Sequence, residues 1–249
     1  MGGWVDLDMR RYLSILLFLG LAFWGCEEEQ DTTPPVDKWW EDYLDYQYLD
    51  LGGSNLTGDF PPEVGNMTNM IDIIFHNNRF TGEIPSEIGS MTNLELLYLR
   101  ENQLSGSLPP EIGDLTNLTY LSLGSNQLAG SIPPEIGNMA SLHGLNLYNN
   151  QLTGEIPSEI WDMTNLVALN LFNNQLTGFI PPEIDNLTSM TMLKLQDNQL
   201  KGAIPESICE LNITWSDSNR FNLSNNQFCP PYPSCIEDYM GVQDITNCN

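Results

Sequence analysis

The sequence predicts an α/β repeat fold, a solenoid with a parallel concave β-sheet and short helical turns on its convex side. Seven units of 24 residues span residues 46–213 of the 249-residue chain, with a glycine at the same position in each. An asparagine and an Ile/Leu-Pro pair recur in the last six, while the first has Ser54 in place of the asparagine. Apolar residues alternate just before each asparagine, and both ends of the repeat run depart from the pattern. Such self-similarity at a fixed period is typical of solenoids, whose coils bury a continuous core only by stacking.

Each unit begins with a short strand. In Leu94-x-x-Leu97-x-Leu99 the last two leucines share one face of an extended segment, while the residues between them face the other way. The asparagine follows where the chain leaves the strand. Its amide carries donors and an acceptor, so a stacked column of these amides can satisfy backbone groups that the turn exposes. The column is expected at Asn78, Asn102, Asn126, Asn150, Asn174 and Asn198.

Each unit then turns at Leu-x-Gly, where glycine tolerates conformations closed to other residues. The following Pro-Pro-Glu-Ile or Pro-Ser-Glu-Ile predicts a helical turn, because proline suits the first helical position and glutamate suits the positive helix start. A column of glutamates is therefore expected on the convex side, at Glu63, Glu87, Glu111, Glu135, Glu159 and Glu183. A metal-binding ladder is the alternative for this column, but solvated carboxylates at helix starts are commoner.

The segment Leu152-Thr-Gly-Glu-Ile-Pro157 and its copies resemble the plant-type subclass of the leucine-rich repeat family, over residues 46–228. The resemblance implies a leucine-rich repeat solenoid that binds a partner protein on its concave face, in an adhesion, recognition or inhibitor-type role. The subclass also includes inhibitors of wall-degrading enzymes and ice-binding members. A carbohydrate or another ordered surface such as ice is therefore the alternative ligand.

Residues 1–25 have the pattern of an export signal. Arg10 and Arg11 precede a 13-residue run with one weakly polar residue, which is followed by Gly25 and Cys26. This resembles a bacterial lipoprotein signal, which implies a chain exported and anchored to the bacterial cell envelope by a lipid on Cys26. The alternative is a free thiol at Cys26 after an ordinary secretory signal. Residues 26–37, acidic and then polar with two prolines, predict a tether.

The ends of the solenoid need covering because their core faces would otherwise meet water. Residues 38–45 predict an N-terminal cap, and residues 214–249 predict an irregular eighth repeat with a disulfide-braced C-terminal cap. Four cysteines gather there, which allows two disulfides in three connectivities: Cys209, Cys229, Cys235 and Cys248. The close cysteine pair of plant-type caps favours Cys229 with Cys235, which leaves Cys209 for Cys248.

Composition argues against several functions. A net charge of −25, from 8 Lys and Arg against 33 Asp and Glu, repels phosphate backbones, so nucleic-acid binding is not expected. The two histidines, His76 and His143, stand at different phases of their units, and no nucleophile–base arrangement, phosphate loop or metal-ligand spacing is present. We expect a monomer without catalytic residues, metal or cofactor, which meets the membrane only through the lipid anchor.

The strand residues that point away from the core supply the candidate binding site. Exposed aromatic and basic side chains are typical of binding hot spots. The candidates on the concave face are His76, Tyr98, Arg100, Tyr120, Tyr148, Phe172 and Lys194. The alternative is that neighbouring rings such as Tyr148 and Phe172 merely pack on each other across strands.

Overall fold

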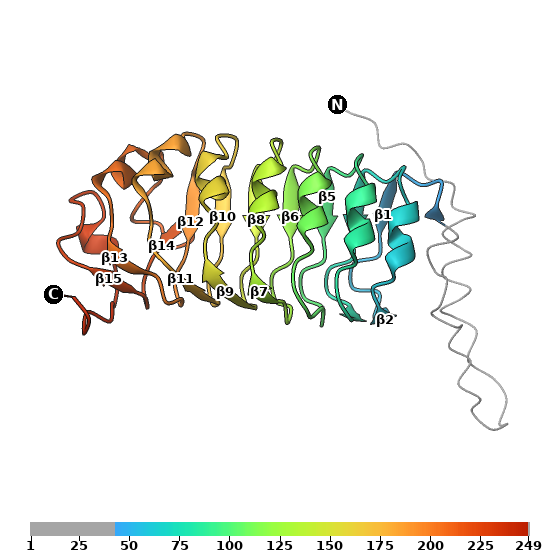
Figure 1. The fold of residues 1–249 in the computed structure, drawn as a ribbon, viewed down its shortest axis with the longest axis horizontal. Helices are drawn as coiled ribbons and strands as arrows, with labels where there is room; N and C mark the ends of the chain where they lie inside the picture. The colour runs from blue at the N-terminus through green and yellow to red at the C-terminus, as the bar shows by residue number, and fades with distance from the viewer. Residues whose placement is uncertain (1–42, 249) are drawn as a thin grey trace, which may run out of the picture. The chain divides into compact units, whose positions relative to one another are not determined.

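A computed structural model describes residues 43–248, which form a row of stacked coils (Figure 1). Each coil adds one short strand to an eight-stranded parallel sheet. The strands in sheet order are β1 (Tyr48–Asp50), β3 (Asp72–Ile74), β5 (Leu96–Tyr98), β6 (Tyr120–Ser122), β8 (Gly144–Asn146), β10 (Ala168–Asn170), β12 (Met192–Lys194) and β14 (Phe221–Asn222). Leu169 pairs with both Leu145 and Leu193, one repeat away on either side. The predicted solenoid with a parallel sheet is confirmed.

A second row of strands follows the asparagines in most coils and forms three small parallel sheets. Its members are β2 (Thr57–Asp59), β4 (Arg79–Thr81), β7 (Ala129–Ser131), β9 (Gln151–Glu155), β11 (Gln175–Thr177), β13 (Lys201–Ala203) and β15 (Gln227–Cys229). The sequence did not predict this row. In β9 only Leu152 is buried, and Gly154 stands inside the strand, so neither β-propensity nor alternation marks the segment.

Short 3-10 helices form the turns opposite the parallel sheet. They are η2 (Pro62–Asn66), η3 (Ser86–Ser90), η4 (Pro110–Asp114), η5 (Pro134–Asn138), η6 (Ser158–Asp162), η7 (Pro182–Asn186), η8 (Glu206–Glu210) and η9 (Glu237–Tyr239). The six glutamates predicted for helix starts lie in the first turns of η2 to η7. Within residues 43–248 no helix is long and apolar enough to cross a membrane.

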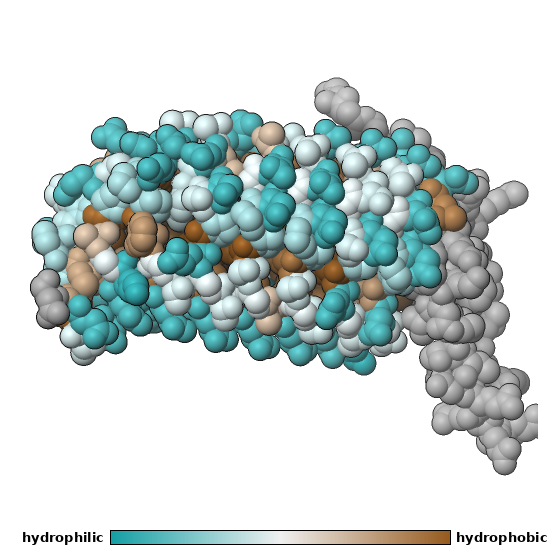
Figure 2. All heavy atoms as spheres, viewed as in Figure 1, coloured by the Kyte–Doolittle hydropathy of each residue, from teal (hydrophilic) through white to brown (hydrophobic). Residues whose placement is uncertain are grey.

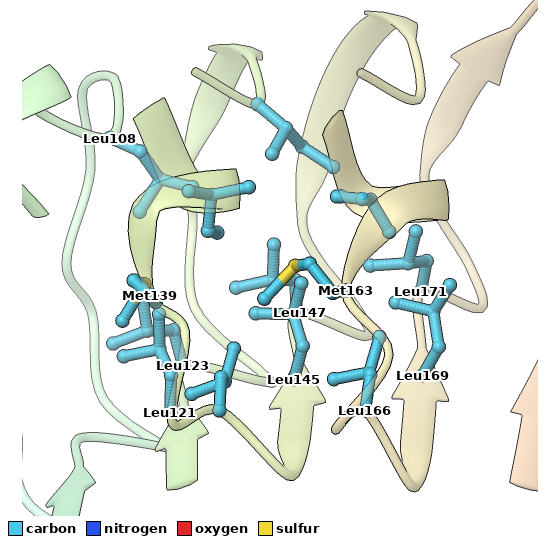
Figure 3. Close-up of a cluster of buried hydrophobic side chains, with 14 of the residues drawn as sticks. Leu108, Leu121, Leu123, Met139, Leu145, Leu147, Met163, Leu166, Leu169 and Leu171 are labelled. Atoms are coloured by element: carbon cyan, nitrogen blue, oxygen red, sulfur yellow. The ribbon is translucent and has the colours of Figure 1, made fainter. Parts of the chain in front are cut away.

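The core lies between the parallel sheet and the helical turns. Leu121 and Leu123 point into it from β6 and the residue just beyond it, and Met139 meets them from the connection after η5 (Figure 3). All three are fully buried, and the neighbouring coils repeat the arrangement. In Figure 2, hydrophilic side chains cover most of the visible face and apolar side chains show as a lengthwise stripe. Each coil therefore buries its apolar face mainly against the coils beside it.

The predicted asparagine column is a continuous hydrogen-bond ladder. The Nδ2 of Asn126 donates to the carbonyl oxygens of Leu99 and Leu123, and its Oδ1 accepts from the Leu104 N–H, all at 3.0 Å. The other asparagines of the column repeat this pattern. The Leu99 carbonyl also accepts from Asn102. The column thus satisfies backbone groups that the turns expose, as predicted.

The C-terminal cap ends this ladder with a glutamine. Asn226 is the last asparagine of the ladder, with donation to Leu195 and Leu223. Gln243 Nε2 then donates to the Leu223 carbonyl at 2.9 Å, and Gln243 Oε1 accepts from the Phe228 N–H at 3.4 Å. An asparagine of a further coil would make the same two contacts. The cap therefore replaces the missing coil both in packing and in hydrogen bonding.

Four extra residues precede the last strand of the sheet, so Leu193 pairs with Phe221 instead of a residue 24 positions on. Trp215, within this longer connection, packs edge to face on Phe221 with ring centroids 4.9 Å apart. Trp215 is partly buried against the core. Trp215 thus packs the longer connection against the core, and β14 still pairs in parallel with β12.

The cysteine pairing favoured by the family resemblance is wrong. Two disulfides form, Cys209–Cys235 with Cα atoms 5.8 Å apart and Cys229–Cys248 with Cα atoms 5.5 Å apart. Cys229 ends β15 in the second row of strands, whereas Cys209 belongs to η8. The two disulfides therefore link the cap segment both to η8 and to β15. A disulfide between Cys229 and Cys235 would close only the short loop between them.

The predicted signal (1–25), the tether (26–37), the anchoring Cys26 and most of the N-terminal cap (38–45) lie outside the described residues. Of that cap, residues 43–45 are described, and the Tyr43 ring packs edge to face on Tyr46, with centroids 5.4 Å apart. Tyr43 and Tyr46 also pack against the core. The N-terminal cap as a whole stays a prediction.

Candidate functional site

Three rows of side chains point away from the core and form the concave face. In the seven strands from β1 to β12, the first row comprises the first residue of each strand, the second row the third residue, and the third row the residue two positions further. In the parallel register, equal positions of neighbouring coils stand side by side. Tyr120 lies in the first row, Tyr98 and Lys194 in the second, and His76, Arg100, Tyr148 and Phe172 in the third.

Phe172 contacts Tyr148 of the coil before it and Lys194 of the coil after it. The two rings stack with centroids 5.0 Å apart and planes 9° apart, and Lys194 Nζ lies 5.3 Å from the Phe172 centroid. Gly124 makes room for the stack, because a Cβ there would lie 2.4 Å from Tyr148 Cε1. Ring stacking contributes roughly 0.5–1.5 kcal/mol and an exposed cation–π contact about 0.5–1 kcal/mol. The contacts hold the three side chains in defined positions.

Tyr120 reaches across the strand that follows it. A Cβ on Gly144 would lie 2.6 Å from Tyr120 Cδ1, so the glycine leaves space for this ring. Beyond it the His143 ring stacks on Tyr120, with centroids 6.3 Å apart, and His143 Nδ1 lies 2.7 Å from the Ser141 carbonyl oxygen. Alternation along the strand does not mark His143 as a neighbour of the site, because His143 directly precedes β8. The one sequence signal is Gly144, whose missing side chain lets the Tyr120 ring reach His143.

The first coils carry the charged part of the concave face. Arg100 forms an ion pair with Glu101, its neighbour in the chain. Burial, helped by the Glu95 carboxylate, raises the pKa of Asp72. Burial also raises the pKa of Tyr98; the charges of Tyr120 and Asp72 add to this rise, and Arg100 opposes it. Tyr98 is therefore protonated at neutral pH and can donate a hydrogen bond to a ligand.

His76 packs over the small Gly52 of the preceding coil. A Cβ on Gly52 would lie 2.9 Å from His76 Cε1. His76 Nδ1 is buried without a hydrogen-bond partner, although the side chain as a whole is half-buried. The nearby Asp50 carboxylate is engaged with the Gly52 N–H at 2.9 Å. His76 and Arg100 thus lie in neighbouring coils but do not join the aromatic stack.

Two concave-face amides that the sequence analysis did not select are the most unusual polar groups here. Asn170 is 9% exposed and Gln196 is 8% exposed. Asn170 Oδ1 and Gln196 Oε1 are buried without a hydrogen-bond partner. Their sequence positions place them on this face, but nothing in the sequence distinguishes an unpaired amide from the paired amides of the ladder.

Between residues 43 and 248 no group of three or more His, Cys, Asp or Glu side chains is placed to hold a metal ion. The glutamates in the first turns of η2 to η7 are exposed except for Glu135, which is half-buried. The arrangement on the concave face suits contact with a large ligand through rings, amides and a few charges. The fold is typical of binding domains that carry no catalytic chemistry.

Two family models match the chain, the leucine-rich repeat region over residues 99–213 and the leucine rich repeat over residues 47–67. Together they cover more than half of the sequence, and the ladder and sheet follow the same period. The chain belongs to the leucine-rich repeat family. No protein of curated function matches this leucine-rich repeat chain.

Solved structures of plant proteins resemble this leucine-rich repeat chain. The leucine-rich repeat ectodomain of the membrane receptor kinase GASSHO1/SCHENGEN3 from Arabidopsis thaliana, in complex with CASPARIAN STRIP INTEGRITY FACTOR 2, is 36% identical over 73% of this chain and 21% of that chain, with a TM-score of 0.68. The plant peptide hormone receptor RGFR1, in complex with RGF2, is 32% identical over 73% of this chain and 28% of the receptor chain, with a TM-score of 0.68. A plant ice-binding protein is 28% identical over 76% of this chain and 74% of its own chain, with a TM-score of 0.52. The chain thus spans less than a third of either receptor structure.

Proposed function

We propose that this leucine-rich repeat chain is a non-catalytic, surface-displayed protein that binds a partner protein through its concave face. The Tyr148–Phe172–Lys194 stack is the observation that carries the proposal. Aromatic side chains dominate binding hot spots, and side chains that are already fixed lose little entropy on binding. The stack also stands out against a chain of net charge −25. That the two similar receptors are complexed with CASPARIAN STRIP INTEGRITY FACTOR 2 and RGF2 supports a protein or peptide ligand.

The packing on the concave face disfavours the two alternative ligands. A sugar ring stacks on a free aromatic face, but the Phe172 ring already contacts Tyr148 of the coil before and Lys194 of the coil after. An ordered lattice such as ice would suit regular columns of polar groups. The asparagine column is instead buried and engaged with the backbone.

An exported, lipid-anchored location completes the proposal. Two disulfides in the C-terminal cap are typical of an oxidising, extracytoplasmic compartment. The lipoprotein-like start supports an anchor at Cys26, in the bacterial cell envelope. Mass spectrometry of the membrane fraction should find Cys26 as a diacylated N-terminal residue. An unmodified Cys26 in that fraction would reject the anchor and leave the concave-face proposal standing.

The binding proposal is tested by replacing Tyr98, Tyr148 and Phe172 with alanine together. Cross-linking on intact cells should then lose partner capture by more than about tenfold, since truncating one hot-spot residue costs about 2 kcal/mol or more. Phe179→Ala and Tyr239→Ala are the matched controls, because both rings are exposed, at 59% and 42%, and lie outside the three concave rows. Unchanged capture by the triple variant, with its circular dichroism intact, would refute the assignment.

A further inference from the structure

The unpaired oxygens of Asn170 and Gln196 are not a general property of this repeat. Asn174, four residues after Asn170 and equally buried, donates to the Leu147 and Leu171 carbonyls and accepts from the Leu152 N–H. Buried side-chain polar atoms are nearly always paired, because an unpaired one costs the full loss of its hydration. Two such atoms on one face of the same sheet therefore call for a partner from outside the chain.

Both amides border the aromatic stack. Asn170 pairs in register with Lys194, and Gln196 occupies, one coil later, the position of Phe172. The Asn173 N–H donates to the Gln196 carbonyl at 3.0 Å, which fixes these two coils relative to each other. Neighbouring strands lie about 4.8 Å apart and alternate residues about 6.6 Å apart, so the two amide-bearing Cα atoms are roughly 8 Å from each other. One small ligand group can therefore contact both side chains.

The chemistry of the patch selects the ligand group. Two acceptor oxygens require two donors, and the Lys194 ammonium requires an acceptor or an anion. An ammonium or guanidinium group would be repelled by Lys194, and a carboxylate would bring no donor to the two oxygens. A hydroxyl brings one donor. A primary carboxamide supplies two N–H donors and one carbonyl acceptor on a neutral group, which matches the patch in both number and charge.

We propose that β10 and β12 carry a carboxamide subsite that receives an Asn or Gln side chain of the partner protein. Both oxygens are buried in the free chain, so each amide turns to face the ligand on binding. The ligand NH₂ then donates to Asn170 Oδ1 and Gln196 Oε1, its carbonyl oxygen accepts from Lys194, and Phe172 forms the wall between them. The assignment of the ligand to a protein rests on the proposed function. The carboxamide selectivity of the patch is independent of it.

Acetamide is the probe, with N,N-dimethylacetamide and acetate as controls. In nitrogen-15 NMR spectra of the full chain, acetamide should shift the side-chain NH₂ signals of Asn170 and Gln196 to saturation. N,N-dimethylacetamide, which has no N–H, and acetate, which has no donor, should leave them unshifted at the same concentration. Shifts of equal size from N,N-dimethylacetamide, or no saturable shift from acetamide, would overturn the subsite.

Apolar substitutions separate binding from folding. Asn170→Leu and Gln196→Met remove an unpaired acceptor and keep the length of the side chain, so each should abolish the acetamide shift at the remaining amide and raise the melting temperature by about 2–4 °C. Asn174→Leu, the matched control, removes paired groups and should lower the melting temperature. A lower melting temperature in both Asn170→Leu and Gln196→Met would show that these oxygens are satisfied within the fold and would overturn the proposal.

The two proposals fail in different ways. If the triple alanine variant loses partner capture while acetamide does not bind the unchanged chain, the carboxamide subsite is wrong and the protein-binding proposal stands. If acetamide binds as expected but the triple variant keeps full capture, the assignment of the ligand to the protein partner is wrong.

Discussion

Replacing Asn126 with leucine tests the hydrogen-bond ladder at its centre. Leucine has the branching and the side-chain length of asparagine and is bulkier, so the change removes hydrogen bonds without opening a cavity. The Leu104 N–H loses the Asn126 oxygen that accepts from it, whereas the Leu99 and Leu123 carbonyls keep a donor from the adjacent asparagines. One buried unpaired N–H costs about 1–3 kcal/mol and each lost hydrogen bond about 0.5–1.5 kcal/mol, which together give a loss of about 2–6 kcal/mol.

Urea unfolding measures this loss, and amide hydrogen exchange at Leu104 locates it. A domain of this size loses about 2–4 °C in melting temperature for each kcal/mol, so a fall of about 4–24 °C is expected. Asn117→Leu is the control, because Asn117 is exposed and donates once, to the Thr92 carbonyl at 2.8 Å; it should cost about 1 kcal/mol or less. A cost at Asn126 no greater than at Asn117, or a Leu104 amide that stays protected, would refute the ladder argument.

Three further predictions follow from the cap and the concave face. Gln243→Leu should lower the free energy of unfolding in urea by about 1–3 kcal/mol, because the Phe228 N–H loses its acceptor. Gln243→Asn should lose a similar amount, because its side chain is one methylene shorter and does not reach that N–H. The raised pKa of Asp72 means that its charged form destabilises the folded state, so Asp72→Asn should raise the melting temperature at pH 7. This gain should disappear as the pH is lowered through the raised pKa of the folded state towards the unfolded value of about 4. Equal melting temperatures of the two proteins at pH 7 would contradict the prediction. Gly124→Ala should push the Tyr148 ring off the stack and change the near-ultraviolet circular dichroism, and an unchanged spectrum would show that the glycine is not needed for this packing.

The parts of the fold that the sequence predicted are those written into every repeat. Leu97 of β5 lies in the core, Glu111 lies at a helix start and Asn126 bonds the backbone, because each has a counterpart 24 residues away in the same environment. The second row of strands escaped prediction, since β9 gains its order from neighbouring backbones and not from its own side chains. Gln243 escaped it for a similar reason, because this glutamine occupies the place of a ladder asparagine without sharing its spacing.

The candidate site shows the same division. Alternation along the strands placed Tyr148 and Phe172 on one face, but whether their rings would meet depended on side-chain conformations and on the space above Gly124. His143 joined Tyr120 through the gap at Gly144, and Asn170 became unusual only through the absence of a partner. These features are relations between side chains of different coils, which a pattern along one coil does not contain.

The sequence by itself determined the period, the stacking of the coils and the column of amides that binds them, because a fixed spacing repeats the same local chemistry at every step. Only the tertiary structure decided the disulfide partners. Cys229 is six residues from Cys235 in the chain, yet the cap folds so that Cys235 meets Cys209 of η8 and Cys248 returns to β15. The cap has no repeat to fix its course, so the distances between its cysteines depend on how it packs over the last coil.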